Sequence, residues 1–309
     1  MERRGFLKRI ALAGAALATA SVPTEAAAKV RKETVAALKS GAGFTLWQIP
    51  SQVNTIGNSY VLLTDKGRVV VMDGGMPEET SFLRGFLGAL GNEVEAWFIS
   101  HPHNDHMGAL NEILKAPKEL KIKRIYHSRF SPSLIALEKP YDGFCLDFYK
   151  HLDETSFPVT DLREAGLQLK IDGLNLKVLG VTNEEFHTNP YNNSSTVIRV
   201  WDKQKSVVFL ADAGVECGNK LLAGPYAKDL DCDYMQMAHH GQRGCDEHFY
   251  KTVNFRVCLW PTPTWVWNND QGKGFNTGPL ETIETRRWMD EKGIKEHHVS
   301  TVEGLWRLA

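Results

Sequence analysis

The residue types best suited to chemistry are concentrated in one stretch, His101-Pro102-His103-Asn104-Asp105-His106. Imidazole and carboxylate groups are the ligands that zinc and similar cations prefer. His101 and His103 can point to one side of an extended loop because they alternate, whereas the adjacent pair Asp105 and His106 diverges. The spacing therefore predicts a metal site that extends to a second ion a few ångströms away.

Three further points of the chain place metal-competent side chains directly after a short apolar run: Asp73, Asp212 and the doublet His239-His240. Such runs are expected to be buried strands, and side chains at the carboxyl ends of strands share one cleft. A carboxylate such as Asp212 can bridge two cations, and the histidines can complete their ligand sets. Asp73 is followed by two glycines, and we expect it to hold the ligand loop through hydrogen bonds.

The elements expected to position these residues fall into two similar halves. In the first half, we expect a strand at 44–49, a hairpin at 58–72, a helix at 79–90 and a strand at 96–100. The second half is expected to contain a helix at 279–292 and strands at 166–171, 174–179, 196–201, 206–210, 234–238, 256–260 and 299–308. Two halves of this order predict an α/β fold in which two sheets pack face to face with helices outside, a four-layer αββα sandwich.

The stretch between the two halves, 128–162, has a weaker pattern. Residues 141–145 are expected to form a loop, and the segments on either side are expected to be helical. Long excursions of this kind often cover a site.

Together, Asp73, the His-x-His-x-Asp-His motif at 101–106, Asp212 and the doublet resemble the signature of the metallo-β-lactamase superfamily. The resemblance covers essentially the whole chain after its N-terminal leader. Within the superfamily, the chain is most similar to the metallo-β-lactamase domain of competence-type DNA-uptake proteins and their free-standing relatives. Those proteins share Asn-Asn-Ser before one strand and His-His-Gly after another. The corresponding stretches here are Asn192-Asn193-Ser194-Ser195 and His239-His240-Gly241.

The resemblance implies a metallo-β-lactamase-like sandwich, a dinuclear metal centre and a hydrolytic activity. It implies two divalent metal ions, most often Zn²⁺, although the same ligand types accept Mn²⁺ or iron. His103 argues against the flavodiiron-type members, which carry a glutamate at this position. The metal ligands expected from the resemblance are His101, His103, Asp105, His106, Asp212, His187 and His239.

Two of these ligand assignments depart from the superfamily pattern. The separate third histidine of the first metal normally follows the strand near Leu179, but Gly180-Val181-Thr182 contains none. His187 is the nearest histidine and is predicted to take this role; the alternative is a loop residue and a metal with fewer protein ligands. In the doublet, only one ring need face the metal, and we expect His239 to do so.

The expected mechanism uses Asp105 and His240 as catalytic residues. Two bound cations lower the pKa of a shared water, so that hydroxide forms at neutral pH, and Asp105 is expected to orient it. His240 is expected to protonate the leaving group. Arg243 and Asn193 are predicted to contact the substrate, Arg243 as the partner of an anion such as phosphate. Residues 260–267, which contain three tryptophans, either line a pocket for an apolar substrate or pack as an ordered loop.

Composition limits the class of substrate. The net charge is −1 and 42% of the residues are hydrophobic, which is ordinary for a globular protein, and no basic block marks a surface for polyanions. We therefore expect a small-molecule or cell-envelope phosphodiester or other ester as substrate, with nucleic acid not favoured. The alternatives are a β-lactam or lactone hydrolase and, from another class, a non-catalytic binding protein of the same fold.

The N-terminal residues predict export. Arg3-Arg4 precedes Phe6-Leu7-Lys8, an apolar run at 10–22 and a small-residue end, which together resemble a twin-arginine signal peptide. The apolar run is too short to span a bilayer as a helix. We predict a signal peptide at 1–28, one hydrolase domain at 29–309, a periplasmic or extracellular location and no membrane span after cleavage. An ordinary secretory signal or an uncleaved anchor is the alternative.

Overall fold

The structure of this protein is a computed structural model, which describes residues 43–309 and five residues before them: Lys29, Glu33, Ala36, Leu38 and Gly41. The predicted signal peptide, 1–28, lies outside the described residues. None of the described helices is long and apolar enough to cross a membrane.

The first sheet joins an antiparallel part to a parallel part. Its strands are β1 (Phe44–Gln48), β2 (Ser59–Thr64), β3 (Val69–Asp73), β4 (Glu93–Phe98), β5 (Lys121–Ile122), β6 (Ile125–His127), β7 (Val159–Asp161) and β15 (Trp306–Leu308). They lie in the order β15-β1-β2-β3-β4-β6-β7, with β5 also paired to β4. The strands from β15 to β3 are antiparallel neighbours, whereas β3, β4, β6 and β7 run parallel.

The second sheet has the same division. Its strands are β8 (Gln168–Ile171), β9 (Leu174–Gly180), β10 (Val197–Trp201), β11 (Ser206–Phe209), β12 (Tyr234–Gln236), β13 (Val257–Trp260) and β14 (Glu296–Val299). They lie in the order β14-β13-β12-β11-β10-β9-β8, antiparallel from β8 to β11 and parallel from β11 to β14. The four strand ends that precede the predicted site residues, those of β3, β4, β11 and β12, therefore all belong to parallel parts of the sheets.

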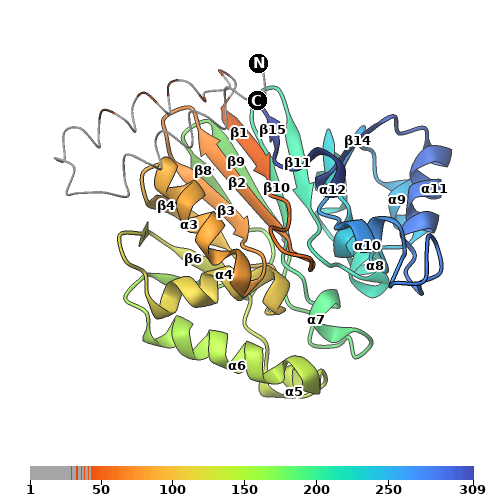
Figure 1. Cartoon of the computed structure of the whole chain (residues 1–309), viewed down its shortest axis with the longest axis horizontal. Helices are drawn as coiled ribbons and strands as arrows, with labels where there is room; N and C mark the ends of the chain where they lie inside the picture. The colour runs from red at the N-terminus through yellow and green to blue at the C-terminus, as the bar shows by residue number, and fades with distance from the viewer. Residues whose placement is uncertain (1–28, 30–32, 34–35, 37, 39–40, 42) are drawn as a thin grey trace.

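The two sheets pack against each other, and helices cover their outer faces (Figure 1). Alternation along the strands produces these layers: in β2, Tyr60 and Leu62 face the core between the sheets, whereas Val61 and Leu63 face the core under the helices. The longer helices are α3 (Thr80–Ala89), α4 (Asn104–Lys115) and α6 (Lys139–Glu154) on the first sheet, and α8 (Val215–Ala223), α9 (Glu247–Thr252) and α11 (Thr282–Lys292) on the second. The predicted four-layer αββα sandwich is confirmed.

Short helical turns connect these elements. They are η1 (Pro77–Glu79), α5 (Pro132–Ile135), α7 (Pro190–Asn193), η2 (Ala227–Leu230), η3 (Ala238–Gly241), α10 (Thr264–Trp267) and α12 (Ser300–Glu303). The strand predicted at 299–308 is interrupted by α12, so that only its end forms β15.

The prediction of a loop at 141–145 is wrong, because these residues lie inside α6. A glycine such as Gly143 costs a helix about 1 kcal/mol relative to alanine. In α6, Cys145, Phe148 and Leu152 fall on one face and are buried, which offsets that cost.

Candidate metal centre

The histidine loop follows β4 and opens α4, with His103 as the residue that caps the helix. The alternation of His101 and His103 brings their rings together, and His101 Nε2 lies 3.0 Å from His103 Nδ1. Asp212, just after β11, places its Oδ2 4.0 Å from His101 Nε2. These three side chains form a first cluster of potential ligands, whose donor atoms all lie within 4.8 Å of one another.

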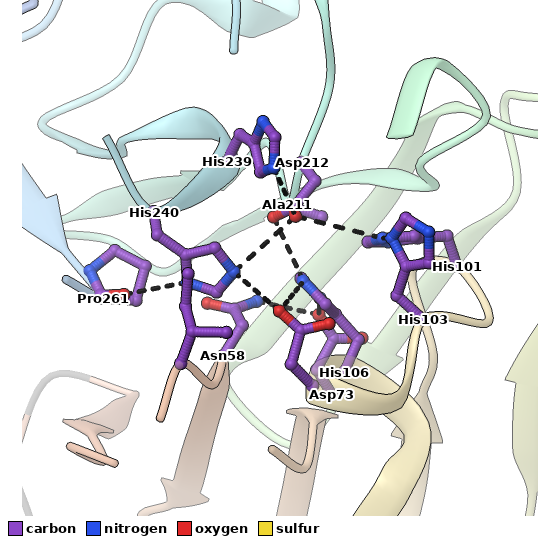
Figure 2. Close-up of polar contacts among 12 residues, drawn as sticks. Asn58, Asp73, His101, His103, His106, Ala211, Asp212, His239, His240 and Pro261 are labelled. Atoms are coloured by element: carbon purple, nitrogen blue, oxygen red, sulfur yellow. Dashed lines mark hydrogen bonds and ion pairs between the residues drawn. The ribbon is translucent and has the colours of Figure 1, made fainter. Parts of the chain in front are cut away.

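A second cluster contains Asp105, His106, Asp212 and His240. Figure 2 labels His106, Asp212 and His240 of this cluster. His106 Nε2 lies 3.1 Å from Asp212 Oδ1, and His240 Nε2 lies 3.1 Å from Asp105 Oδ2 and 3.6 Å from Asp212 Oδ2. With metal–nitrogen bonds of about 2.0–2.1 Å, tetrahedral ligands lie roughly 3.3 Å apart, so these spacings suit one ion. Asp212 belongs to both clusters and can bridge them.

Two buried atoms of the second cluster, His106 Nε2 and Asp212 Oδ1, face each other at 3.1 Å without the geometry of a hydrogen bond, and neither has another hydrogen-bond partner among the described residues. Leaving such polar atoms unpaired in a dry interior costs free energy, and buried polar groups almost always find a partner. A divalent cation bound to both atoms would satisfy them. The donor set and its unpaired atoms therefore fit a metal ion.

Behind the ligands, Asp73 organises the loop. Its Oδ1 accepts a hydrogen bond from the Ser100 backbone N–H at 2.8 Å, and its Oδ2 accepts from Asn58 Nδ2 at 2.8 Å. His106 Nδ1 lies 2.7 Å from the same Oδ2 and donates to it, which leaves His106 Nε2 with a lone pair for a metal. Asp73 adopts a left-handed backbone conformation, with φ of 55°. It belongs to neither ligand cluster.

The doublet presents both rings to Asp212. His239 Nδ1 donates to the Arg243 carbonyl at 3.0 Å, and His240 Nδ1 donates to the Pro261 carbonyl at 2.9 Å, so in the neutral form of each ring Nε2 carries the lone pair that a metal would use. These Nε2 atoms lie 3.7 Å and 3.6 Å from Asp212 Oδ2. His240 is fully buried in the second cluster, whereas His239 is partly exposed and outside both clusters. The geometry favours His240 as the ligand, the reverse of the assignment expected from the sequence.

The pKa values of the buried histidines and carboxylates in the centre are shifted in directions that favour a bound positive charge. Burial lowers the pKa of His101 well below its usual value, and the neighbouring imidazoles act in the same direction. Burial also lowers the pKa of His106 and His240, but the carboxylates, Asp212 foremost, outweigh it and raise both. Burial raises the pKa of Asp105 and Asp212, yet the imidazoles outweigh it and hold both below their usual range. Protons on His106 and His240 thus occupy the place that a cation would take.

Glu138, at the start of α6, is part of the centre although the sequence offered no signal for it. Its Oε2 lies 3.0 Å from His103 Nε2, 35 residues away in the chain, and its Oε1 accepts from the Tyr191 backbone N–H at 2.9 Å. A carboxylate on the far nitrogen of a ligating histidine fixes the orientation of the ring. Glu138 therefore directs His103 Nδ1 toward His101.

Three predicted site residues point elsewhere. Asn193 is buried, and its Nδ2 donates to the Thr188 carbonyl at 2.8 Å and to Glu216 Oε2 at 3.0 Å. Arg243 donates to the Pro279 carbonyl at 2.7 Å instead of facing the clusters. His187 is exposed and belongs to neither cluster.

In place of Asn193, its neighbour Asn192 faces the centre. Asn192 Nδ2 lies 3.3 Å from His239 Nε2, and the buried Asn192 Oδ1 has no partner among the described residues. The Asn-Asn-Ser motif was a usable signal for this segment, but the choice between its two asparagines depends on the path of α7.

The aromatic segment at 260–267 divides its side chains between two roles. Trp260 is buried and packs edge-on against Trp267, with ring centroids 5.3 Å apart. Trp265 lines a cavity of about 500 Å³ together with Asn54, Asn268 and other polar residues. The packing alternative is therefore seen for Trp260 and Trp267, whereas the cavity beside Trp265 has a mainly polar lining and includes no residue of the two clusters.

Comparison with known proteins places the fold in a family. The family model described as "Metallo-beta-lactamase superfamily" matches residues 54–241. The chain belongs to the metallo-beta-lactamase superfamily. Members of this superfamily are largely metal-dependent hydrolases. A comparison with curated proteins found no match.

Solved structures of the superfamily resemble this chain at low sequence identity. The metallo-beta-lactamase fold protein YhfI from Bacillus subtilis has a TM-score of 0.51 and 13% identity over 85% of this chain and 99% of its own. CmlA, a diiron beta-hydroxylase from Streptomyces venezuelae, has a TM-score of 0.51 and 13% identity over 86% of this chain and 54% of its own. Unliganded yeast PDE1 has a TM-score of 0.49 and 9% identity over 84% of this chain and 97% of its own. At such identities the likeness to YhfI and CmlA shows the fold alone, and the similarity to competence-type members stays a prediction.

Proposed function

We propose that this protein is a dinuclear metal-dependent hydrolase that cleaves a phosphodiester or another ester. The observation that carries the proposal is the pair of buried ligand clusters that share Asp212. The first ion would be held by His101, His103 and Asp212, and the second by Asp105, His106, Asp212 and His240. The mixture of imidazole and carboxylate donors suits two zinc ions, with Mn²⁺ or iron as substitutes.

When bound, such a pair of ions supplies a hydroxide at neutral pH and neutralises the charge that develops on the substrate oxygen. Asp105 uses one carboxylate oxygen, Oδ2, toward His240. Its side chain is partly open, and we assign its other oxygen to orienting the attacking water. His239 is partly exposed beside Asp212, and Asn192 Nδ2 lies 3.3 Å from its Nε2; we assign this pair to contacting the substrate.

The substrate class follows from what surrounds the centre. Arg243, the residue expected to meet an anion, is engaged by the Pro279 carbonyl and by Glu281. A small or cell-envelope ester is therefore favoured over a nucleic acid, whose binding requires several basic contacts. The same observation favours an uncharged lactone or β-lactam as the second candidate substrate.

The test is a panel of chromogenic phosphodiester, phosphomonoester, lactone and β-lactam substrates, assayed with added zinc or manganese. The variants His103→Ala and Asp212→Asn should lose both bound metal and turnover. Full activity in either variant would contradict the metal mechanism. Elemental analysis addresses the rival of a non-catalytic binding protein, because well under one equivalent of metal in the purified protein would favour it.

The location is a separate part of the proposal. We infer export through the segment at 1–28, supported by the Arg3-Arg4 pair and the short apolar run after it. A reporter fused to this segment should reach the periplasm, and Arg3→Lys with Arg4→Lys should block its export. Export that is unaffected by the double substitution would favour an ordinary secretory signal.

A further inference from the structure

The apolar face of α6 is longer than the core it covers. Cys145, Phe148 and Leu152 recur at the spacing of one helix face and are buried. One turn earlier, the same side of the helix carries Tyr141 and Phe144, which remain 39% and 47% exposed. The helix thus carries apolar side chains past the edge of the core into solvent.

Much of this exposure falls in one segment of the chain. Nine large hydrophobic side chains are exposed among the described residues, and four of them lie within residues 137–146: Leu137, Tyr141, Phe144 and Leu146. Single exposed hydrophobic residues are ordinary, but a group of them marks a binding surface. We call Leu137, Tyr141 and Phe144 the α6 rim.

The α6 rim borders the metal centre directly. The Tyr141 ring packs against the ring of His103, with centroids 4.5 Å apart. Leu137 precedes Glu138, whose carboxylate lies 3.0 Å from His103 Nε2. The rim is therefore continuous with a residue that we assign as a metal ligand.

We propose that the α6 rim binds an apolar group of the substrate, an alkyl chain or an aromatic ring, attached next to the bond that is cleaved. The inference rests on the proposed hydrolase function and adds the substrate class. Tyr141 is both in contact with the His103 ring and 39% exposed, so it is the rim residue nearest the first cluster that a substrate group could reach from solvent. A second copy of the chain is the weaker occupant, because a stable interface buries about 800 Å² per partner and the rim offers three side chains.

The test measures binding of n-alkyl phosphonates to the full zinc-loaded protein by calorimetry. A phosphonate presents tetrahedral oxygens to the metals and is not hydrolysed, so the readout does not depend on turnover. A fully buried methylene strengthens binding about fourfold, and one covered on a single side about twofold. Octylphosphonate should therefore bind on the order of 10-fold more tightly than butylphosphonate.

The double variant Leu137→Ser/Phe144→Ser should reduce this difference while methylphosphonate binds as before, because neither side chain packs on a residue assigned as a metal ligand. Leu146→Ser is the matched control, because Leu146 is also exposed but lies about 140° around the helix from Tyr141. It should keep the full dependence on chain length. Circular dichroism on all variants checks that α6 is still folded.

The outcomes separate the two proposals. Equal affinity at every chain length, with methylphosphonate bound, overturns the apolar-group inference and leaves the hydrolase proposal standing. No binding at any length by zinc-loaded protein contradicts the hydrolase proposal and the inference with it. A wild-type dimer that the double variant converts to a monomer in sedimentation would assign the α6 rim to self-association and overturn the inference.

Discussion

Replacing Asp73 with asparagine removes one charge and one acceptor from the support of the ligand loop. Its Oδ2 receives hydrogen bonds from Asn58, from the Ser100 hydroxyl at 2.9 Å and from His106, while Oδ1 receives the Ser100 backbone N–H. An asparagine has one acceptor oxygen, so its amide group must face at least one of these donors. The loss of one charge-assisted hydrogen bond costs about 1.5–3 kcal/mol of stability in the metal-free protein.

The effect on metal binding follows from the contact between Asp73 and His106. Without the carboxylate, His106 loses the partner that holds its Nδ1 proton and directs Nε2 to the metal. Substitutions of this kind lower metal affinity by about 10- to 100-fold. Competition with a chromophoric chelator at constant pH measures the change, and urea denaturation of the metal-free protein measures the loss of stability.

Asp172→Asn is the control for this experiment. Asp172 has nearly the same left-handed backbone, with φ of 54° against 55° for Asp73, and accepts a hydrogen bond from the Thr64 hydroxyl at 2.6 Å. Asparagine tolerates this conformation, so the control isolates the role of His106 from the backbone. If Asp73→Asn changed zinc affinity no more than Asp172→Asn does, the reasoning on the Asp73–His106 contact would be refuted.

Three further variants test other contacts. Glu138→Gln should weaken the first ion and leave the second unchanged, because Glu138 orients His103 and contacts no ligand of the second cluster. Zinc titration should show one of two affinities falling, and an equal loss at both would contradict this role. His240→Ala should lower the zinc content from two equivalents to one, whereas His239→Ala should keep both ions and lose turnover. Elemental analysis distinguishes the two variants, and equal metal loss would contradict the assignment of His240 as the ligand. Burial lowers the pKa of His127 to about 4, so the unfolded chain takes up a proton first as the pH falls below about 6.5. The contribution of neutral His127 to the free energy of unfolding is therefore full above that pH, and about 2–3 kcal/mol of it is lost between pH 7 and pH 4.5. In denaturation curves measured at a series of pH values, His127→Gln should reduce the fall of the unfolding free energy with pH. An unchanged fall would exclude His127 as its source.

Sequence reasoning succeeded where the determinants are local. The spacing within 101–106 and the apolar runs before Asp73, Asp212 and the doublet predict strand ends with ligands, and the four-layer sandwich follows from their order. These features depend on side-chain alternation and strand direction, both of which are determined by residues that are close together in the sequence.

The remaining parts of the centre depend on distant backbone. The roles within the doublet follow from two left-handed residues and from the carbonyls of Arg243 and Pro261, which no local pattern reveals. Glu138 directly precedes α6 and meets His103 from 35 residues away in the chain, and α6 itself continues through 141–145, the segment predicted to be a loop. In that segment the burial of a helix face outweighed local propensity.

Because Asp212 belongs to both clusters, tight metal binding requires that the two halves of the chain have already packed together. The first half of the chain supplies His101, His103, Asp105 and His106, but each cluster also needs Asp212 from the second half. A chain that has folded only its first sheet thus presents an incomplete set of ligands, and tight binding begins when the two sheets have docked. Each ion of the proposed pair would then tie one half to the other and add its binding free energy to the contact between the sheets, about 4 kcal/mol when the free metal is 1,000-fold above its dissociation constant.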